Sequence, residues 1–367
     1  MTRPWRDYNY FLLGCVIVLT GFSLAMVYSA TLKAPDTQGY FSRHLVNLII
    51  GSVAMLLLTA LDYHALQAWA VPLYLGTLVL LAIVLVVGHS ISGAQSWLNL
   101  GLRTFQPSEP AKLLIIVALA AYWARYEQQG GASRVQLGGL LLVSIPMALV
   151  FIQPDFGTAM VFATVWLMMA WTAGLRWWQL LLLMIVAVPA GIYGWRHVLA
   201  PYQKARLLVF IDPVKYDPQL ENGAWQIMQS LTAIGSGGLT GRGWTHGVLS
   251  QGGFLPAQYT DFIFAITGEE LGFFGAAVLL LFETLLIWQA LAIAAAARDR
   301  FGRLIAVGVA AMFMCHLLVN VGMNMSIMPI TGIPLPFVSY GGSFTITTLA
   351  AVGLLQSVSL RRRRIVF

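Results

Sequence analysis

The chain has 367 residues, of which 59% are hydrophobic and only 10% are charged, and its mean hydropathy is +0.77. A soluble protein of this length carries about 25% charged residues, so the composition excludes a water-soluble globular protein and indicates an integral membrane protein. The formal net charge is +7, but the basic residues lie at the ends of apolar runs, where cations orient membrane proteins and meet anionic lipids. No nucleic-acid partner is expected.

Ten apolar runs predict an all-α, polytopic membrane protein with about ten transmembrane helices in a single domain, residues 1–367. The first run shows no cleavage signal and is expected to be a retained helix. The fifth and sixth predicted helices, at about 137–153 and 156–173, are separated only by Gln153-Pro154-Asp155. The alternative is that they form one interrupted element. The eighth is longer than a bilayer requires and is expected to protrude or bend. The predicted helices are at about 10–31, 43–61, 70–88, 109–124, 137–153, 156–173, 177–196, 260–295, 303–325 and 341–360.

Cationic residues favour one orientation of these helices. With a cytoplasmic N-terminus, the short outer loops carry few cations, chiefly Lys33, Arg43 and Arg103. The positive-inside rule therefore predicts both termini in the cytoplasm, with the one long loop, at about 197–259, and Asp261 on the outer face. The inner side then receives Arg3, Arg6, Arg125, Arg134, Arg176, Arg298, Arg300, Arg303 and Arg361 to Arg364.

The long loop contains an amphipathic segment and a glycine-rich run. Asn222 can cap a helix suited to the lipid headgroup layer. The run GSGGLTGRG, residues 235–243, lacks the strand that precedes a dinucleotide site and the GK[ST] ending of a P-loop, so a hinge is predicted there. The apolar stripe of the amphipathic helix consists of Trp225, Met228, Leu231 and Ile234.

Ionisable residues at membrane depth are costly, so each is a candidate functional residue. Two cysteines inside apolar runs exclude a disulfide framework, and the six histidines show no metal-ligand spacing, so no protein metal site is predicted. Four groups of charged residues stand out: Asp261 with Glu269 and Glu270; Glu109 with Lys112, one helical turn apart; Asp155 at the helix break; and Lys204 with Arg206 at the start of the long loop.

Each group also has a structural explanation. Asp261 and Asp155 could cap helices, Glu109 and Lys112 could form a structural ion pair, and the two loop cations could contact lipid phosphates. Taken together, outer cations suit a lipid-linked phosphate or pyrophosphate, and a nearby carboxylate suits a general base acting on a sugar hydroxyl. The residues alone thus leave two classes open: a transferase acting on a polyprenyl-phosphate-linked substrate, and a transporter of an anionic lipid.

Five strings in the chain resemble the SEDS family of bacterial cell-shape, division and sporulation proteins. The resemblance covers essentially the whole chain, and the last string is closer to the elongation member of the family than to the division member. The strings are QPSEPAKL (106–113), QPDFGTA (153–159), QSLTAIGSGGLTGRG (229–243), LPAQYTDFIFAITGEELG (255–272) and PITGIPLPFVSYGGS (329–343).

This resemblance implies a peptidoglycan glycosyltransferase of the bacterial cytoplasmic membrane, which polymerises lipid II with a class B penicillin-binding protein and other elongation-complex membrane proteins as partners. Asp261 matches the family's essential aspartate and is the expected base. Cations at Arg206, Lys204 or Lys112 would stabilise the departing undecaprenyl pyrophosphate, with a divalent cation (Mg²⁺ or Mn²⁺) as a further candidate. A lipid II flippase, a division-specific polymerase and a non-catalytic scaffold remain the alternatives.

Glu269 and Glu270 lie about 12 and 13 Å beyond Asp261 along an ideal helix, too far to share the proton transfer, and are expected to form interhelical hydrogen bonds or ion pairs. The chain departs from the family pattern at several positions. Arg103 stands three residues before Gln106, where the family has an arginine two residues before, which weakens its assignment as a substrate contact. The other departures are Ser96, Asn99, Ala257 and Tyr259, the last standing where a histidine is common.

Overall fold

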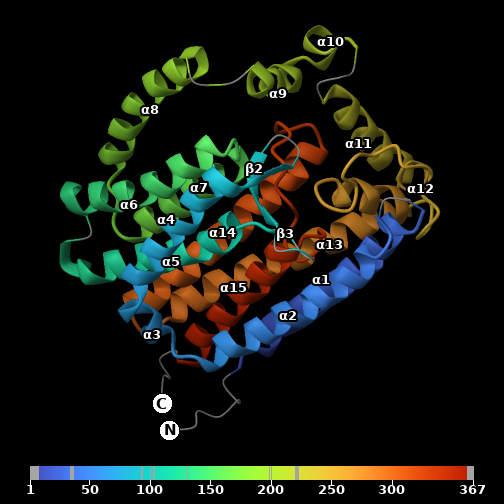
Figure 1. Ribbon diagram of the computed structural model, residues 1–367. Helices are drawn as coiled ribbons and strands as arrows, with labels where there is room; N and C mark the ends of the chain where they lie inside the picture. Colours follow the sequence, from blue (N-terminus) through green and yellow to red (C-terminus); the bar gives the residue numbers. More distant parts are fainter. Residues whose placement is uncertain are drawn as a thin grey trace.

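The computed structural model describes residues 8–33, 37–91, 94–99, 101, 104–129, 131–197, 199, 201–219 and 223–361. They form a helical bundle with one small sheet (Figure 1). All ten predicted helices are present, each within a few residues of its predicted bounds, which confirms the all-α class. They are α1 (Tyr10–Thr31), α2 (Tyr40–Ala60), α4 (Ala70–Val87), α5 (Ser108–Arg125), α6 (Ser133–Ile152), α7 (Phe156–Thr172), α8 (Trp177–His197), α13 (Ile263–Ala296), α14 (Arg300–Asn324) and α15 (Gly342–Leu360).

In the described part of the chain, eight helices are long and apolar enough to cross a membrane. The other two predicted spans are shorter or more charged: α7 has 17 residues, and α5 carries Glu109, Lys112 and Arg125. The protein is therefore a multi-pass membrane protein. That residues 1–367 form one domain remains a prediction.

Several short elements lie between the long helices. The segment predicted as one long loop is largely helical, and only one of its helices was expected, because helices of one to three turns leave little periodic signal. The strands form an antiparallel sheet in the order β1-β2-β3, between α4 and α5. These elements are α3 (Tyr63–Ala68), β1 (His89–Ile91), β2 (Ala94–Asn99), β3 (Thr104–Phe105), η3 (Glu127–Gln129), α9 (Pro201–Ile211), α10 (Pro213–Tyr216), α11 (Ala224–Gly237) and α12 (Val248–Gly252).

Helix α11 is the predicted amphipathic helix. It begins after Gly223, which has φ 114° and serves as the N-cap; the predicted cap, Asn222, lies outside the described residues. Its small residues, among them Ala224, Ser230 and Gly237, are buried. Gly237 lies against α13, where a Cβ would be 1.9 Å from the oxygen of Gly268, and the Ser230 hydroxyl donates to the oxygen of Asn324 on α14 (2.8 Å). The predicted apolar stripe faces outward, with Trp225, Met228 and Leu231 39%, 50% and 44% exposed.

The centre of the bundle is formed by α14 and α15. In the apolar 18-residue stretch of each of these helices, 83% and 89% of the residues are buried, against 6% in α8 at the periphery (Figure 1). Glycines let α15 approach its neighbour α2 closely. A Cβ at Gly353 would lie 2.4 Å from the backbone oxygen of Met55, so a larger residue there would push the helices apart. Small residues commonly allow such close packing of membrane helices.

The long helix α13, which was expected to protrude or bend, bends at Gly272, where the backbone has φ 66° and ψ −163°. The break exposes amide groups that the glycine-rich run satisfies: Phe273 N–H donates to the oxygen of Gly238 (2.9 Å). A Cβ at Gly272 would lie 2.3 Å from the nitrogen of Gly241. The run is therefore packed into the bend, and this close packing, rather than the expected hinge, accounts for its glycines.

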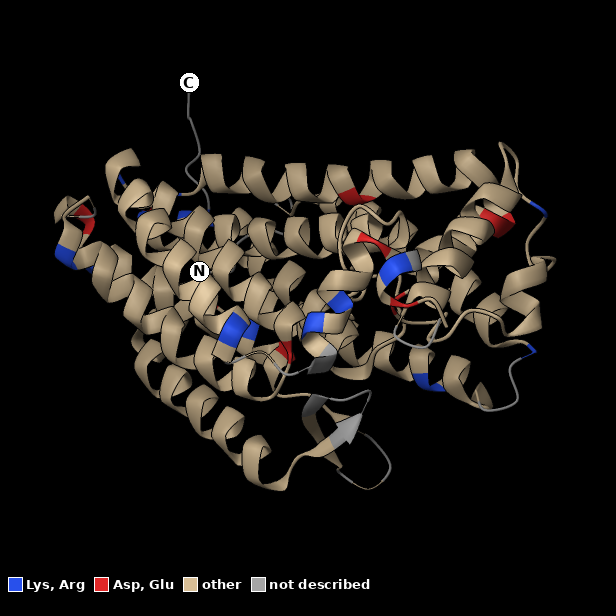
Figure 2. Cartoon of the chain, turned by 90° about the horizontal axis from the view of Figure 1, so that it is seen from above, with Lys and Arg blue, Asp and Glu red and all other residues tan. Residues whose placement is uncertain are grey.

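Charged residues lie mostly at helix ends and around the loops near the middle of the molecule, and long stretches of the peripheral helices carry none (Figure 2). The start of α1 and the end of α15 lie at one end of the bundle, and α9–α12 lie toward the other (Figure 1). At the terminal end, Arg361 pairs with Asp62 (3.2 Å), and His64 contacts both Asp62 (2.8 Å) and Asp299 (3.2 Å). This polar cluster ties α3 to the start of α14 and the end of α15.

Candidate functional site

A cavity of about 430 Å³ brings together most of the charged residues singled out in the sequence. We call it the polar cavity. It lies between α5, α7, α9 and α14 and the loops that precede α13 and α15. Five predicted site residues line it: Glu109, Lys112, Asp155, Arg206 and Asp261. They come from four regions far apart in sequence, so the tertiary fold assembles them into one site.

Glu109 and Lys112 form a buried ion pair in this cavity, 4% and 2% exposed. The Lys112 ammonium donates to both Glu109 carboxylate oxygens (2.8 and 2.9 Å). It also lies 3.1 Å from Nε2 of His316 on α14. Nδ1 of His316 is 3.1 Å from the oxygen of Pro334, a group that can only accept. Nδ1 therefore carries the proton and Nε2 accepts from Lys112, so all three ammonium hydrogens are used.

His316 was not identified from the sequence. The one available signal is an ionisable residue inside an otherwise apolar helix, which favours a functional position but does not indicate a partner. Only the packing of α14 against α5 places this ring beside Lys112. The pair expected from sequence is thus a three-residue network, Glu109–Lys112–His316.

Asp155 has the capping role that was considered for it and also lines the polar cavity. Its carboxylate accepts from the backbone N–H of Thr158 (3.0 Å) and from the Thr158 hydroxyl (2.8 Å) at the start of α7. The Gln106 side-chain amide donates to the same carboxylate (3.3 Å). Asp155 therefore joins the QPSE segment to the QPDFG break.

Asp261 does not cap α13. The N-cap is Phe262, and no side chain caps this helix start. The Asp261 carbonyl oxygen accepts instead from the side-chain amides of Asn320 (2.9 Å) and Asn324 (3.0 Å). The backbone is thus held from α14 while the carboxylate lines the polar cavity.

The environment of Asp261 suits a proton acceptor. Burial raises the pKa of its carboxyl from the ordinary 3.8 to about 6, while the Thr260 hydroxyl and the charge of Arg206 oppose this rise. The residue is half-buried and keeps access to the cavity. A general base works best when its pKa lies near the working pH, and this carboxylate is ionised at neutral pH.

Asn320 and Asn324 were also missed in the sequence. They lie four residues apart on α14 and therefore point in the same direction. Asn324 accepts from the N–H of Ala265 (3.2 Å) in addition to holding Asp261. Two amides at this spacing in an apolar helix indicate a polar contact, but their partner is defined only by the fold.

Glu269 and Glu270 do not line the polar cavity. Glu269 accepts from the N–H groups of Leu249 (2.7 Å) and Ser250 (2.9 Å) at the start of α12. Glu270 accepts from the hydroxyl of Ser29 on α1 (2.6 Å). Both carboxylates thus anchor neighbouring segments to α13 through hydrogen bonds, which is the role expected from their depth.

Three predicted substrate contacts, all of them cations, have different outcomes. Arg206 is exposed on α9 and lines the polar cavity. Lys204, on the same helix, does not line this cavity. Residues two apart in a helix point in nearly opposite directions, so the grouping of these two cations at one site was wrong. Arg103 lies outside the described residues, and its role stays a prediction.

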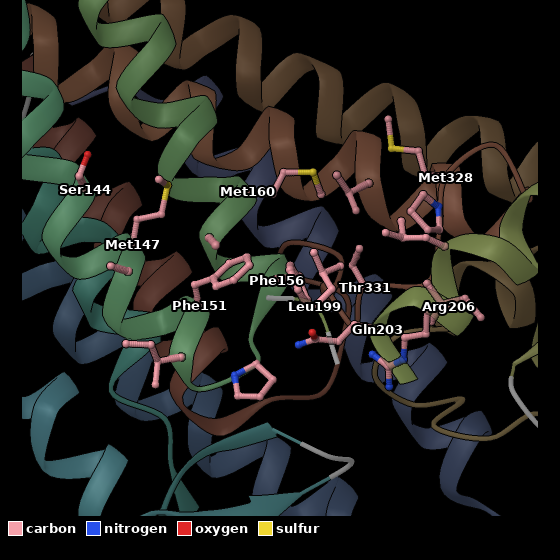
Figure 3. A pocket seen from close by; sticks show the side chains of 18 residues that line it. Ser144, Met147, Phe151, Phe156, Met160, Leu199, Gln203, Arg206, Met328 and Thr331 are labelled. Atoms are coloured by element: carbon pink, nitrogen blue, oxygen red, sulfur yellow. The ribbon is translucent and has the colours of Figure 1, made fainter. Parts of the chain in front are cut away.

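A second, larger cavity of about 810 Å³ adjoins the first (Figure 3). We call it the apolar cavity. It lies between α6, α7 and α9, and its walls are mainly methionine, phenylalanine and aliphatic side chains, including Met147, Phe151 and Met328. Arg206 brings its guanidinium to one side of it (Figure 3). The two cavities share the lining residues Pro154, Arg206, Ile330 and Thr331.

Comparison with known proteins agrees with the motifs. Residues 9–364 match the family of FtsW, RodA and SpoVE, described as "Cell cycle protein". The chain is 37% identical over 349 residues to the peptidoglycan glycosyltransferase MrdB of Escherichia coli K12, covering 95% of this chain and 92% of the relative.

Two solved structures resemble it throughout. One, reported as "Structural coordination of polymerization and crosslinking by a peptidoglycan synthase complex", has a TM-score of 0.81 and 32% identity, covering 97% of this chain and 98% of the other. The rod shape determining protein RodA of Thermus thermophilus has a TM-score of 0.73 and 30% identity, covering 98% and 99%. The chain therefore belongs to the FtsW/RodA/SpoVE family of cell cycle proteins, the family that its sequence motifs resemble.

Proposed function

We propose that this protein is a peptidoglycan glycosyltransferase that polymerises lipid II into β-1,4-linked glycan strands, with Asp261 as the general base. The observation that carries the proposal is the junction of the two cavities at Arg206. Lipid II has a long isoprenoid tail, a pyrophosphate and a sugar headgroup, in that order. The apolar cavity suits the tail, Arg206 suits the pyrophosphate, and the polar cavity with Asp261 suits the reacting sugar.

The mechanism follows from the chemistry of the two linkages. The donor sugar is α-linked to pyrophosphate and the product is β-linked, so a single in-line displacement inverts the anomeric carbon. Asp261 takes the proton from the acceptor's 4-hydroxyl as that oxygen bonds to the donor's C1. The bond from C1 to the pyrophosphate oxygen breaks at the same time, and undecaprenyl pyrophosphate leaves with the electron pair.

Two cations of the chain are available to stabilise this leaving group. Arg206 lies at the junction of the cavities and can form two parallel hydrogen bonds to phosphate oxygens. Lys112 lies in the cavity wall with its three ammonium hydrogens on Glu109 and His316, so it would act on the leaving group only through the electric field of this network. Among the described residues, no three His, Cys, Asp or Glu side chains come together as a metal site. A divalent cation would therefore be held chiefly by the substrate's own pyrophosphate.

The cellular setting is part of the same proposal. We place the protein in the bacterial cytoplasmic membrane with both termini in the cytoplasm, which the arginines predicted on that side support. A class B penicillin-binding protein is the proposed partner, supported by similarity to a member of a complex that couples polymerization and crosslinking. The elongation role is preferred to the division role because of the ITGIPLPFVSYGGS motif and the likeness to RodA.

Glycan formation from labelled lipid II in detergent tests the proposal. The purified protein is combined with its class B penicillin-binding partner, with and without Mg²⁺ or Mn²⁺, and an inhibitor suppresses unrelated glycosyltransferases. Polymer is expected from the wild-type complex. Detergent micelles have no sidedness, so a flippase would make no polymer in this assay; absence of polymer from a folded complex in every condition would overturn the proposal.

Replacing Arg206 with alanine is expected to lower kcat/KM for lipid II by about 10- to 100-fold, since a hydrogen bond to a charged group contributes about 1.5–3 kcal/mol. Stability should change by less than about 0.5 kcal/mol, as is usual for an exposed side chain. The matched control is Lys204→Ala, which removes the same charge from the same helix outside both cavities. Equal losses from both variants would mean that only the general positive charge of α9 matters.

Polymerisation is expected to fall as the pH is lowered through about 6, the pKa to which burial raises Asp261. The base must be ionised to accept a proton, so kcat/KM should drop about tenfold for each pH unit below that value. The measurement is the initial rate between pH 5 and 8 in one detergent and at constant ionic strength. A rate that stays level down to pH 5 would contradict the assignment of Asp261 as the titrating base.

A further inference from the structure

Three tyrosines from distant segments meet in the polar cavity beside Asp261. Tyr40 is the first residue of α2, Tyr259 precedes α13, and Tyr340 precedes α15. The rings of Tyr40 and Tyr340 are stacked, with centroids 5.0 Å apart and planes at 9°. Tyr259 stands at a steep angle to both, at 5.2 and 5.7 Å. All three line the cavity and are half-buried.

The cluster is held rigidly next to the proposed base. The N–H of Tyr340 donates to the carbonyl oxygen of Tyr259 (2.8 Å), which stands two residues before Asp261 in the chain. The ring of Tyr40 contacts both other rings, with centroids 5.2 Å from Tyr259 and 5.0 Å from Tyr340. Tyr40 also has the Arg43 guanidinium 5.8 Å from its ring centre. Tyr40 is therefore the supporting ring of the cluster, and Tyr259 and Tyr340 are the rings placed to contact a ligand.

The in-line geometry of the reaction indicates that the donor and the tyrosine cluster occupy different parts of the site. The two cavities meet at Pro154, Arg206, Ile330 and Thr331, and none of the three tyrosines belongs to this boundary. The donor's pyrophosphate lies at the boundary in the proposed function. In an in-line displacement the acceptor oxygen attacks C1 from the side opposite the leaving group, so the acceptor sugar lies away from the boundary and next to the base.

We propose that Tyr259 and Tyr340, supported by Tyr40, form the binding subsite for the acceptor's N-acetylglucosamine ring. This inference rests on the proposed function and names the acceptor side of that site. A pyranose ring has an apolar C–H face and a rim of hydroxyls. Tyrosines match both, because the ring contacts the apolar face and the phenol hydroxyl bonds the rim. The tyrosine at position 259 is thus a feature of this chain that binds substrate directly.

Single-transfer kinetics with two separate substrates tests the subsite. The donor is a lipid II whose N-acetylglucosamine 4-hydroxyl is blocked, so that it donates but cannot accept. The acceptor is a lipid II phosphonate with carbon in place of the anomeric oxygen, which accepts but cannot donate. Each substrate is varied at saturating concentration of the other, for the wild type and for leucine and phenylalanine variants of Tyr259 and Tyr340.

The leucine variants are expected to raise the acceptor KM about tenfold, a factor that corresponds to about 1.4 kcal/mol, near the upper end of the usual range for an aromatic contact. The donor KM should stay within twofold, and the phenylalanine variants, which keep the ring but lose the hydroxyl, should raise the acceptor KM by less than the leucine variants do. Tyr28→Leu, at a tyrosine outside the polar cavity, is the matched control. Tyr340→Met, whose longer and more flexible side chain adapts better to the space left by the ring, replaces Tyr340→Leu if the leucine variant does not fold.

An equal rise in donor and acceptor KM, or an unchanged acceptor KM, would overturn the subsite. These outcomes are distinct from failure of the proposed function, in which the wild type itself would form no transfer product.

Discussion

Asp261→Asn is expected to abolish glycan polymerisation and to leave the fold intact. Asparagine keeps the shape of the side chain but cannot take the proton from the acceptor hydroxyl, and loss of a general base typically lowers turnover by about 10²- to 10⁴-fold. The backbone at this position is held through its carbonyl oxygen by Asn320 and Asn324. Those two hydrogen bonds do not involve the carboxylate, so the substitution leaves them in place.

The same substitution should not lower thermal stability at pH 8. The pKa of Asp261 is raised in the folded protein, so the fold favours the protonated carboxyl, and stability falls as the pH rises from about 4 to about 6. A neutral amide removes this penalty, and the melting temperature at pH 8 is expected to equal or exceed that of the wild type.

Polymer yield and melting temperature in the same detergent check both expectations for Asp261→Asn. Asp212→Asn, at a helix cap outside the polar cavity, is the matched control and should polymerise like the wild type. Wild-type turnover in Asp261→Asn would refute the base assignment. A large loss of melting temperature would instead give Asp261 a structural role.

Lys112→Ala is expected to lower both stability and activity. The change leaves the buried Glu109 carboxylate without its cation and His316 without the donor to Nε2. Removing one partner of a buried ion pair costs about 3–5 kcal/mol, because the remaining charge is then buried and uncompensated. The variant alone therefore cannot separate a structural from a catalytic role.

The double variant Glu109→Leu/Lys112→Met separates the two roles. Replacing a whole buried pair by apolar residues of similar size is often neutral for stability, so the melting temperature should recover most of the loss seen in Lys112→Ala. Polymerisation should not recover, because the positive charge at the cavity wall is still absent. Recovery of both stability and polymerisation would show that the pair only supports the fold.

The sequence by itself determined the class of the protein and most of its helices. Long apolar runs with sparse charges are a local signal, since each span must satisfy its backbone hydrogen bonds within its own segment. The bend in α13 was also predictable, because its apolar run exceeds the thickness of a bilayer. The short helices α9, α10 and α12 were not predicted, since they are held by contacts with other segments and carry little periodicity of their own.

The candidate site was only partly predictable. Charged side chains are costly in a membrane, and this identified Glu109, Lys112, Asp155 and Asp261 as candidate functional residues. The motifs around them indicated the family of the chain. The residues that complete the site, His316 and the asparagines of α14 among them, could not be assigned to it, because Lys112 and Asp261, which they hold, lie more than fifty residues away along the chain.

Only the tertiary structure decided which residues share a cavity. It separated Lys204 from Arg206 by the helical repeat of α9, and it directed Glu269 and Glu270 to hydrogen bonds outside the site. It also gathered three tyrosines from three distant segments beside Asp261. Such groupings depend on how helices pack against each other in three dimensions, and a pattern along one chain contains that information only where the interacting residues are neighbours in sequence.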